Sequence, residues 1–411
     1  MSLNLAALGV KLASLRSNAG LTQDEVAKRL GVSRAAVIHT EGGQRAPNAL
    51  ELADLANLYR VSLGDLMSAG AMSPSDPLVA LGRLAPEVTH DPVAGEAVRS
   101  CLAICQEGVA LETVLERPVR SGPPAYEGVL RGGYADAALQ GQDAAEQERR
   151  RLGLSDNPIV GLPQVISAQG IWVAETDFPD GVSGLFLHHS SVGIVVLVNR
   201  AHSFTRRRFS YAHEYAHALF DRDLEVQLTS KQNSNELRER RANAFAASFL
   251  LPRRGVEKLL TSLNAMGSSR ISYSSYDAAS GGHIEAERRL PSGSQIVRAT
   301  HVAAVAHRFG VSYAATCYRL FELGYVNRQE LSELMNRQDA AAALGDALGL
   351  GESTLGKDDQ TCRADLELVR QVALLAIDAF QRQLITKKRL LEISDKLPIP
   401  REQLLQFAND E

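Results

Sequence analysis

Residues 209–217 read FSYAHEYAH, and this stretch decides the fold. It contains the pattern His-Glu-x-x-His, with His213 and His217 four residues apart. On a helix this spacing places both imidazoles on one face, one turn apart, where they can bind a single Zn²⁺. Glu214 follows the first histidine and is placed to take a proton from a water at the metal. The pattern predicts a catalytic zinc site on a helix; two surface histidines on an amphipathic helix are the alternative.

A catalytic zinc needs a third protein ligand and an open fourth position. Glu239 lies on the next predicted helix, about residues 234–250, which could fold back antiparallel against the helix predicted at 206–220. Glu236 lies one turn earlier on the same face and is the alternative ligand. The intervening turn holds three more acidic residues, which we expect to face solvent: Asp221, Asp223 and Glu225.

We call the helix predicted at 206–220 the metal helix. Before it, three short apolar runs predict strands, at residues 171–174, 184–187 and 193–198. We expect them to form a small antiparallel sheet packed on the metal helix. The strand at 193–198 could be an edge strand beside that helix, where an extended peptide could add by β-augmentation.

Taken together, residues 144–255 resemble the ImmA/IrrE-type metallopeptidases. The matching segments before the metal helix are Asn157-Pro158-Ile159, Gly170-Ile171-Trp172-Val173, Ser183-Gly184 and Val198-Asn199. The metal helix and the helix after it match over Arg208-Phe209-Ser210-x-Ala212-His213-Glu214-x-x-His217 and Glu239-x-x-Ala242-Asn243-x-Phe245-Ala246-Ala247-x-x-Leu250-Leu251-Pro252.

The resemblance implies an α+β, zincin-like core within a mainly α-helical, multidomain chain. It implies that His213, His217 and Glu239 are the zinc ligands and that Glu214 is the general base. The implied reaction is hydrolysis of a peptide bond in a transcriptional repressor, often itself a helix-turn-helix protein, which relieves repression under stress or phage induction. Tyr215 and Ala216 replace a common aliphatic-glycine pair, at positions that do not touch the metal.

The first 68 residues predict a compact domain of five short helices, the last of which opens at Val61. The run LTQDEVAKRLGVS at residues 21–33, and Glu41-x-Gly43-x-Arg45-x-Pro47 after it, resemble the XRE-type helix-turn-helix. Such domains place their second motif helix, here residues 34–40, in the major groove.

Residues at both ends of this motif are candidate DNA contacts. We expect Ser33, Arg34 and His39 to meet base edges, and Gln23, Gln44 and Arg45 to hold phosphates. Ile38 departs from the pattern, where a polar residue is usual, and so does Thr40, where an aliphatic or aromatic one is usual.

The charge of this domain is small: residues 1–70 hold seven Lys or Arg against six Asp or Glu, a net of +1. Useful affinity for DNA therefore needs dimerisation or specific contacts, and we expect a homodimer on an inverted repeat. A protein-docking or dimerising module is the alternative for this domain.

The composition of the chain excludes several classes of protein. Its 411 residues carry 44 Lys or Arg against 48 Asp or Glu, which excludes a generally basic protein that coats nucleic acid. Four cysteines exclude a disulfide framework of the secreted type. No apolar run approaches a membrane span, and no signal segment is visible at the N-terminus, so a cytoplasmic location without membrane contact is expected.

We predict four regions: a helix-turn-helix domain at 1–68, a linker and helical connector at 69–143, a metallopeptidase domain at 144–290 and a helical region at 291–411. The last region contains a second helix-turn-helix-like segment at 301–324, which is expected to pack as structure. The glycine-rich stretch at 120–143 is expected to be loose, and a polar helix is expected from Ala144 to Arg151.

Three hypotheses for the function follow. The first is a zinc endopeptidase coupled to a DNA-binding domain. The second is a DNA-binding regulator whose zinc site is structural or sensory and catalyses nothing. The third is self-cleavage between the two domains, with the stretch at 120–143 as the cleaved segment.

Overall fold

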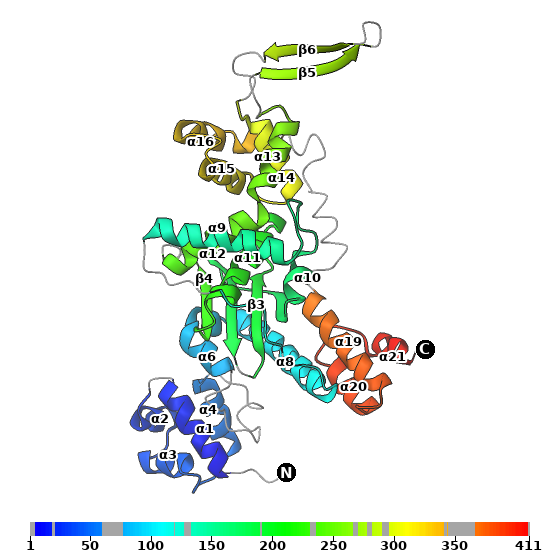
Figure 1. Cartoon of the computed structure of the whole chain (residues 1–411). Coiled ribbons are helices and arrows are strands. Elements are labelled where there is room, and N and C mark those ends of the chain that lie inside the picture. Colours follow the sequence, from blue (N-terminus) through cyan, green and yellow to red (C-terminus); the bar gives the residue numbers. More distant parts are fainter. Residues whose placement is uncertain are drawn as a thin grey trace. The chain divides into compact units, whose positions relative to one another are not determined.

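The computed structural model divides the chain into two compact units, Met1–Pro86 and Glu87–Glu411 (Figure 1). The structure describes residues 5–18, 21–59, 77–118, 120–126, 133–189, 191–230, 236–265, 270–277, 282–289, 296–340, 343 and 366–409.

The first unit is helical. Its helices are α1 (Leu5–Asn18), α2 (Gln23–Leu30), α3 (Arg34–Glu41), α4 (Ala49–Tyr59) and α6 (Pro77–Leu84). The first four enclose one apolar core, formed mainly by Leu8, Leu12, Leu15, Val26, Val37, Leu52 and Leu55. The four helices predicted between residues 5 and 59 are confirmed, and the fifth, predicted at Val61, lies outside the described residues.

A tight turn joins α2 to α3. Thr22 begins α2 with a capping box, in which its side chain and that of Glu25 each accept a backbone N–H from the other residue. Gly31 ends α2 at a φ of 67°, in the left-handed region that favours glycine. Ser33 then begins α3, and its Oγ accepts the backbone N–H of Ala36 at 3.2 Å. These caps set where α3 starts and which of its faces meets the core.

The second unit contains a four-stranded sheet. Its strands are β1 (Ile171–Thr176), β2 (Val182–His189), β3 (Gly193–Asn199) and β4 (Val226–Ser230), in the order β1-β3-β2-β4. The three predicted strands are confirmed, and β4 was not predicted. The sheet is mixed, so the predicted antiparallel sheet is wrong for one pair: β1 runs parallel to β3. Because β2 and β3 form an antiparallel hairpin, β1 pairs on the far side of β3.

The prediction that β3 is an edge strand is also wrong. It lies between β1 and β2, and the edges of the sheet are β1 and β4. Every residue from Ile194 to Asn199 is buried. An apolar run without alternation is typical of a strand covered on both faces, which the sequence of β3 already indicated. An extended peptide therefore cannot add to β3.

Helices α10 (Leu162–Ser167) and α11 (Phe204–Phe220) pack directly on this sheet. Three further helices of this region are α9 (Tyr134–Arg151), α12 (Leu237–Leu250) and α13 (Arg253–Ser262). The metal helix α11 contacts β2 and β3, while α12 lies against both α11 and α9 (Figure 1). The predicted helices at 206–220 and about 234–250 are thereby confirmed as α11 and α12.

The helix expected from Ala144 begins ten residues earlier, at Tyr134, so the second half of the stretch expected to be loose is helical. Gly141 explains the difference. A Cβ on this residue would overlap the backbone oxygen of Arg241, and it would come 2.8 Å from the backbone nitrogen of Phe245. The glycine lets α9 pack closely on α12, although in the sequence it resembles a helix breaker.

Helix α8 (Pro92–Val114) follows the short α7 (Pro86–His90) and packs against β1. Gly108 of α8 faces the indole of Trp172 on β1, where a Cβ would collide with the ring. The guanidinium carbon of Arg120 lies 3.5 Å from the centre of the same indole. The indole of Trp172 thus lies between α8 and the guanidinium of Arg120.

The rest of the second unit is a hairpin followed by helices. The elements are β5 (Arg270–Asp277), β6 (Gly282–Arg289), α14 (Ala299–Phe309), α15 (Tyr313–Glu322), α16 (Arg328–Met335), α19 (Glu367–Gln381), α20 (Lys387–Ser394) and α21 (Arg401–Asn409). Helix α19 packs against α8, where Arg117 pairs with Asp378 at 2.9 Å. No helix among the described residues is long and apolar enough to cross a membrane.

The predicted second helix-turn-helix-like segment corresponds to α14 and α15. Gly310 ends α14 at a φ of 63°, and the Oγ of Ser312 caps α15. Arg319 of α15 is buried, and its Nε donates to the backbone oxygen of Leu251 at 3.2 Å. These contacts attach α15 to the C-terminal end of α12.

Candidate metal centre

Two antiparallel helices bring the three predicted ligands together. The Nε2 of His213 lies 3.1 Å from the Nε2 of His217, and the two carboxylate oxygens of Glu239 lie 3.1 and 3.4 Å from these nitrogens. The predicted antiparallel return of the second helix is confirmed, because His213 meets Asn243 while His217 meets Glu239, which comes earlier on α12. All three ligand side chains are buried.

The other nitrogen of each imidazole is held by an oxygen. The Nδ1 of His213 lies 3.0 Å from the Oδ1 of Asn243, and the Nδ1 of His217 lies 2.8 Å from the Oδ2 of Asp221. Since an amide oxygen and a carboxylate accept hydrogen bonds, each Nδ1 is the donor and carries the proton. Both Nε2 lone pairs then point at the same place. A neutral imidazole oriented in this way can bind a metal through Nε2, because the hydrogen bond from its Nδ1 already fixes the ring and its tautomer.

Asp221 is the centre of a polar network next to His217. Besides the imidazole, it accepts hydrogen bonds from Arg238 at 2.8 Å and from Arg241 at 2.7 Å. The expectation that this aspartate faces solvent is wrong, since it is buried, whereas Asp223 and Glu225 in the same turn are exposed. The two arginines supply the charge that makes a buried carboxylate tolerable.

The electrostatics of the site favour a positive charge at its centre. Burial by itself would lower the pKa of His217, but its hydrogen bonds to Asp221 and Glu239 outweigh burial and raise that pKa to about 10. Burial works to raise the pKa of Glu239, but its hydrogen bonds with both histidines hold that pKa well below its usual range. The site therefore attracts a proton or a metal cation to the point between these three side chains.

The spacing of the donor atoms fits zinc. Bonds of about 2.0–2.1 Å in a tetrahedral arrangement place ligand atoms about 3.4 Å apart. The three distances between the donor atoms are 3.1, 3.1 and 3.4 Å. Two nitrogen lone pairs that face each other at this distance repel, and a cation between them removes the repulsion. Two imidazoles and one carboxylate are a donor set of catalytic zinc sites.

Glu214 lies beside this group, with Thr229 of β4 as a polar neighbour. It is completely buried, and neither of its carboxylate oxygens has a hydrogen-bond partner among the described residues. Burial raises its pKa. Gly184 of β2 makes room for it, because a Cβ there would overlap Oε1 and come 2.9 Å from the carboxyl carbon. An unpaired buried carboxylate needs an explanation, and a substrate or water in the site would supply the missing donor.

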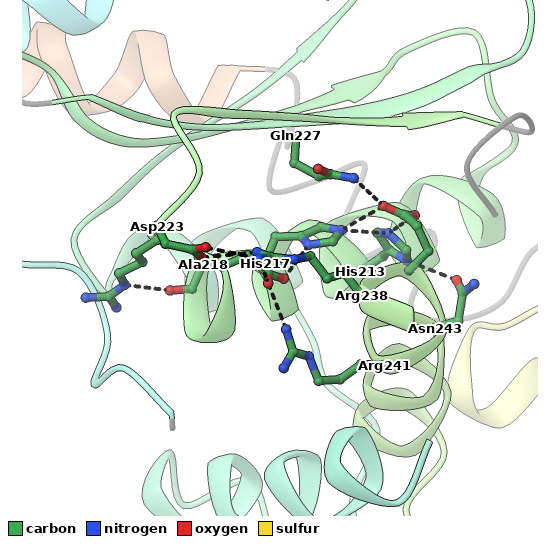
Figure 2. A network of polar contacts seen from close by, with 11 residues as sticks. His213, His217, Ala218, Asp223, Gln227, Arg238, Arg241 and Asn243 are labelled. Atoms are coloured by element: carbon green, nitrogen blue, oxygen red, sulfur yellow. Dashed lines mark hydrogen bonds and ion pairs between the residues drawn. The ribbon is translucent and has the colours of Figure 1, made fainter. Parts of the chain in front are cut away.

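Strand β4 adds one more residue to the site. The Nε2 of Gln227 donates to the Oε1 of Glu239 at 2.7 Å (Figure 2). This bond fixes one oxygen of the carboxylate and couples the edge strand β4 to helix α12. The alternative third ligand, Glu236, is the exposed N-cap residue of α12 and is not part of the group.

Sequence reasoning missed four contributors, namely Gly184, Asp221, Gln227 and Asn243. A signal existed for two of them. Asp221 lies four residues after His217, which is one helical turn, and Asn243 lies four residues after Glu239. Gly184 and Gln227 lie on paired strands, and their place depends on the register between β2 and β4.

In the first unit, the residues predicted to contact DNA differ in their exposure and in whether they already form hydrogen bonds within the protein. Ser33, Arg34, His39 and Gln44 are exposed, and the Nδ1 of His39 lies 2.6 Å from the Oε1 of Gln44. The amide of Gln23 donates to Glu41 at 2.9 Å. Arg45 donates to Glu51 at 2.6 Å and to Thr40 at 3.2 Å.

Two family models match the chain. Residues 7–69 match a helix-turn-helix domain, and residues 166–268 match an IrrE N-terminal-like domain. The chain joins a helix-turn-helix domain to an ImmA/IrrE-type domain. The IrrE N-terminal-like match includes the sheet and the helices α11, α12 and α13, and hence the whole group of candidate ligands. This family implies a metallopeptidase-type fold and a metal, and the helix-turn-helix implies a partner in DNA. No curated protein matches this chain.

Proposed function

We propose that this chain is a zinc-dependent endopeptidase coupled to a DNA-binding domain, and that it cuts a transcriptional repressor. One observation carries the proposal: His213, His217 and Glu239 converge on one point, while Glu214 lies beside them with no partner among the described residues. A site that merely held a metal would not need a fourth, unpaired carboxylate at such a cost in desolvation.

In this proposal His213, His217 and Glu239 hold the metal, and Asp221 and Asn243 keep the imidazoles in the ligating tautomer. When bound, zinc acts as a Lewis acid that polarises the scissile carbonyl and makes water more acidic. Glu214 takes a proton from the attacking water and passes it to the leaving amine. Its raised pKa suits both steps, because a general base works best when its pKa approaches the working pH.

The helix-turn-helix domain would bring the enzyme to a DNA site, as a homodimer on an inverted repeat. The substrate would be a repressor that is itself a helix-turn-helix protein, and its cleavage would relieve repression under stress. The fusion of the two domains in one chain supports this link between a DNA site and a protein substrate.

One observation favours a second candidate, a regulator whose zinc is structural or sensory. The three ligand residues and Glu214 are each no more than 2% exposed. Structural zinc sites are closed, whereas catalytic sites keep a position open to substrate. In this candidate metal binding changes DNA binding and no peptide bond is cut.

The substitution Glu214→Gln separates the two candidates. Gln is nearly isosteric but cannot accept the proton, and loss of a general base costs about 10²–10⁴ in rate. A protease carrying this change keeps zinc, fold and DNA binding but leaves its repressor intact in cells, so derepression fails. Immunoblotting of the repressor, a reporter gene and metal analysis of the purified protein provide the three readouts.

Glu236→Gln is the matched control, since this exposed glutamate of α12 lies outside the metal group. It should retain zinc, cleavage and derepression. His213→Ala and Glu239→Ala should lose zinc in either candidate. Normal derepression by zinc-loaded Glu214→Gln would reject the protease and support the sensor.

A further inference from the structure

Helix α3 turns one face away from its own domain. Val37 and Thr40 are buried, and Val37 belongs to the apolar core. The opposite face is exposed and consists of Arg34, Ala35, Ile38 and His39. At 100° per residue, Ala35 and Ile38 lie at the centre of this face, with Arg34 and His39 on its two sides.

The centre of the face is therefore apolar, although its flanks are polar. Ile38 is 43% exposed, and one exposed aliphatic side chain is by itself ordinary on a protein surface. It lies three residues from Ala35, the spacing of neighbours on a helix surface. Together the two side chains form a small apolar patch, which we call the α3 patch.

The flanking residues are held outward. The side chain of Arg34 is 61% exposed, and its Nη1 lies 3.5 Å from the Oδ2 of Asp24, which is also exposed. Such a surface pair is weak and exchanges readily for a better acceptor. His39 is oriented by Gln44 through its Nδ1. Arg34 and His39 therefore lie on either side of the apolar α3 patch. This arrangement favours a partner that presents hydrogen-bond acceptors next to an apolar group.

We propose that the α3 patch recognises the C5-methyl group of thymine in the major groove, next to a guanine that Arg34 contacts. The inference rests on the DNA binding proposed above and deepens it. Thymine is the one base whose major-groove edge presents a methyl group, and alanine and other apolar side chains are its usual partners. Arginine is the commonest partner of the O6 and N7 of guanine.

A protein partner fits this face less well. A stable protein interface buries about 800 Å² on each partner, far more than two side chains at the centre of one short helix can provide. The exposed guanidinium beside the patch also favours a polyanion over an apolar protein surface.

The test uses DNA in which thymine is replaced by deoxyuridine, which differs from thymine by the C5-methyl alone. The full-length protein is first used to select its site from random sequences. Each thymine of that site is then replaced singly by deoxyuridine, and binding is measured at fixed salt. We expect one or two positions in each half-site to weaken about fourfold, the effect of leaving one methyl group in water. Other thymines should be insensitive.

Ile38→Ala should bind the thymine and deoxyuridine probes of those positions almost equally, and thermal unfolding checks that the exposed substitution leaves the fold intact. Leu50→Ala is the matched control, because Leu50 is an aliphatic residue of the same unit, 77% exposed and outside α3. It should keep the discrimination of the unchanged protein.

The outcomes separate this inference from the function on which it rests. A selected site that tolerates every deoxyuridine substitution rejects methyl recognition while DNA binding stands. Failure to select any site rejects both. Discrimination that persists both in Ile38→Ala and in Ala35→Ser also rejects the α3 patch, because a residue outside the patch must then contact the methyl group.

Discussion

The glycine at position 184 fixes the position of Glu214, the proposed general base, at the scale of single atoms. Its hydrogen faces the carboxylate of Glu214, at a distance that leaves no room for a methyl group. Because the carboxylate is fully buried between β2 and α11, it cannot move into solvent to avoid a larger neighbour. The position of the carboxylate oxygens of Glu214 therefore depends on Gly184, a residue without a side chain that lies on a different element.

We predict that Gly184→Ala retains zinc but loses most of its proteolytic activity. The ligands are unchanged, whereas Glu214 is displaced by about 1 Å, and a misplacement of this size can cost about 10² in rate. Metal analysis and cleavage of the repressor measure the two effects. Ser183→Ala, the adjacent change on β2, should affect neither. Full activity in Gly184→Ala would show that Glu214 does not act from the position seen here.

The site also illustrates how far single residues can be predicted from the sequence. His213, Glu214 and His217 follow from one helical turn, because their relative positions are set by local geometry. Glu239 lies on a different helix from the two histidines, so its place in the site depends on how α11 and α12 pack. It was predicted because, in the family that the chain resembles, the motif around Glu239 accompanies the His-Glu-x-x-His motif. Gln227 could not be predicted, since its contact with Glu239 depends on β4, a strand too polar and too short to be recognised.

At the scale of elements, the start of α3 depends on one hydroxyl. Ser33 was predicted to contact a base, yet its Oγ is already engaged by the backbone N–H of Ala36. An N-cap serine contributes about 1 kcal/mol of stability. The same residue thus sets the register of the helix that presents Arg34 and the α3 patch.

We predict that Ser33→Ala lowers the free energy of unfolding of the first unit by about 1 kcal/mol. Ser33→Asp should restore stability, because aspartate is an equally good cap, but its negative charge should weaken DNA binding. Thermal unfolding and binding measured on the same samples distinguish the two effects. A change in base preference by Ser33→Ala without loss of stability would favour the base contact instead.

Helices were predicted better than the sheet, for a physical reason. The periodicity of α11 and α12 lies within each segment, whereas the parallel pairing of β1 with β3 is decided by contacts between segments far apart in the chain. Helix α9 was predicted ten residues too short because Gly141 has a packing role that the residue alone does not reveal.

At the scale of the whole molecule, the metal group belongs to one unit alone. All of its residues lie within the unit that begins at Glu87, and the helix-turn-helix domain has its own core. A ligand that binds the folded form of one unit stabilises that unit by mass action, by about 2.7 kcal/mol at a concentration 100 times its dissociation constant.

We predict two unfolding transitions in calorimetry, of which zinc raises one. A chelator should lower that same transition and leave the other unchanged, and His213→Ala should remove the response to zinc. Two transitions that both rise with zinc would mean that the units unfold together.

The enclosure of Trp172 by α8 and Arg120 has a practical consequence, because it is the single tryptophan of the chain. Its fluorescence is an intrinsic optical label for the contact between α8 and β1, to which the helix-turn-helix domain contributes no signal. The emission of a buried indole shifts to longer wavelength when water reaches it. A departure of α8 from the sheet would therefore change the colour of the emitted light, so that substrate or DNA could be tested for such a motion without attaching a dye.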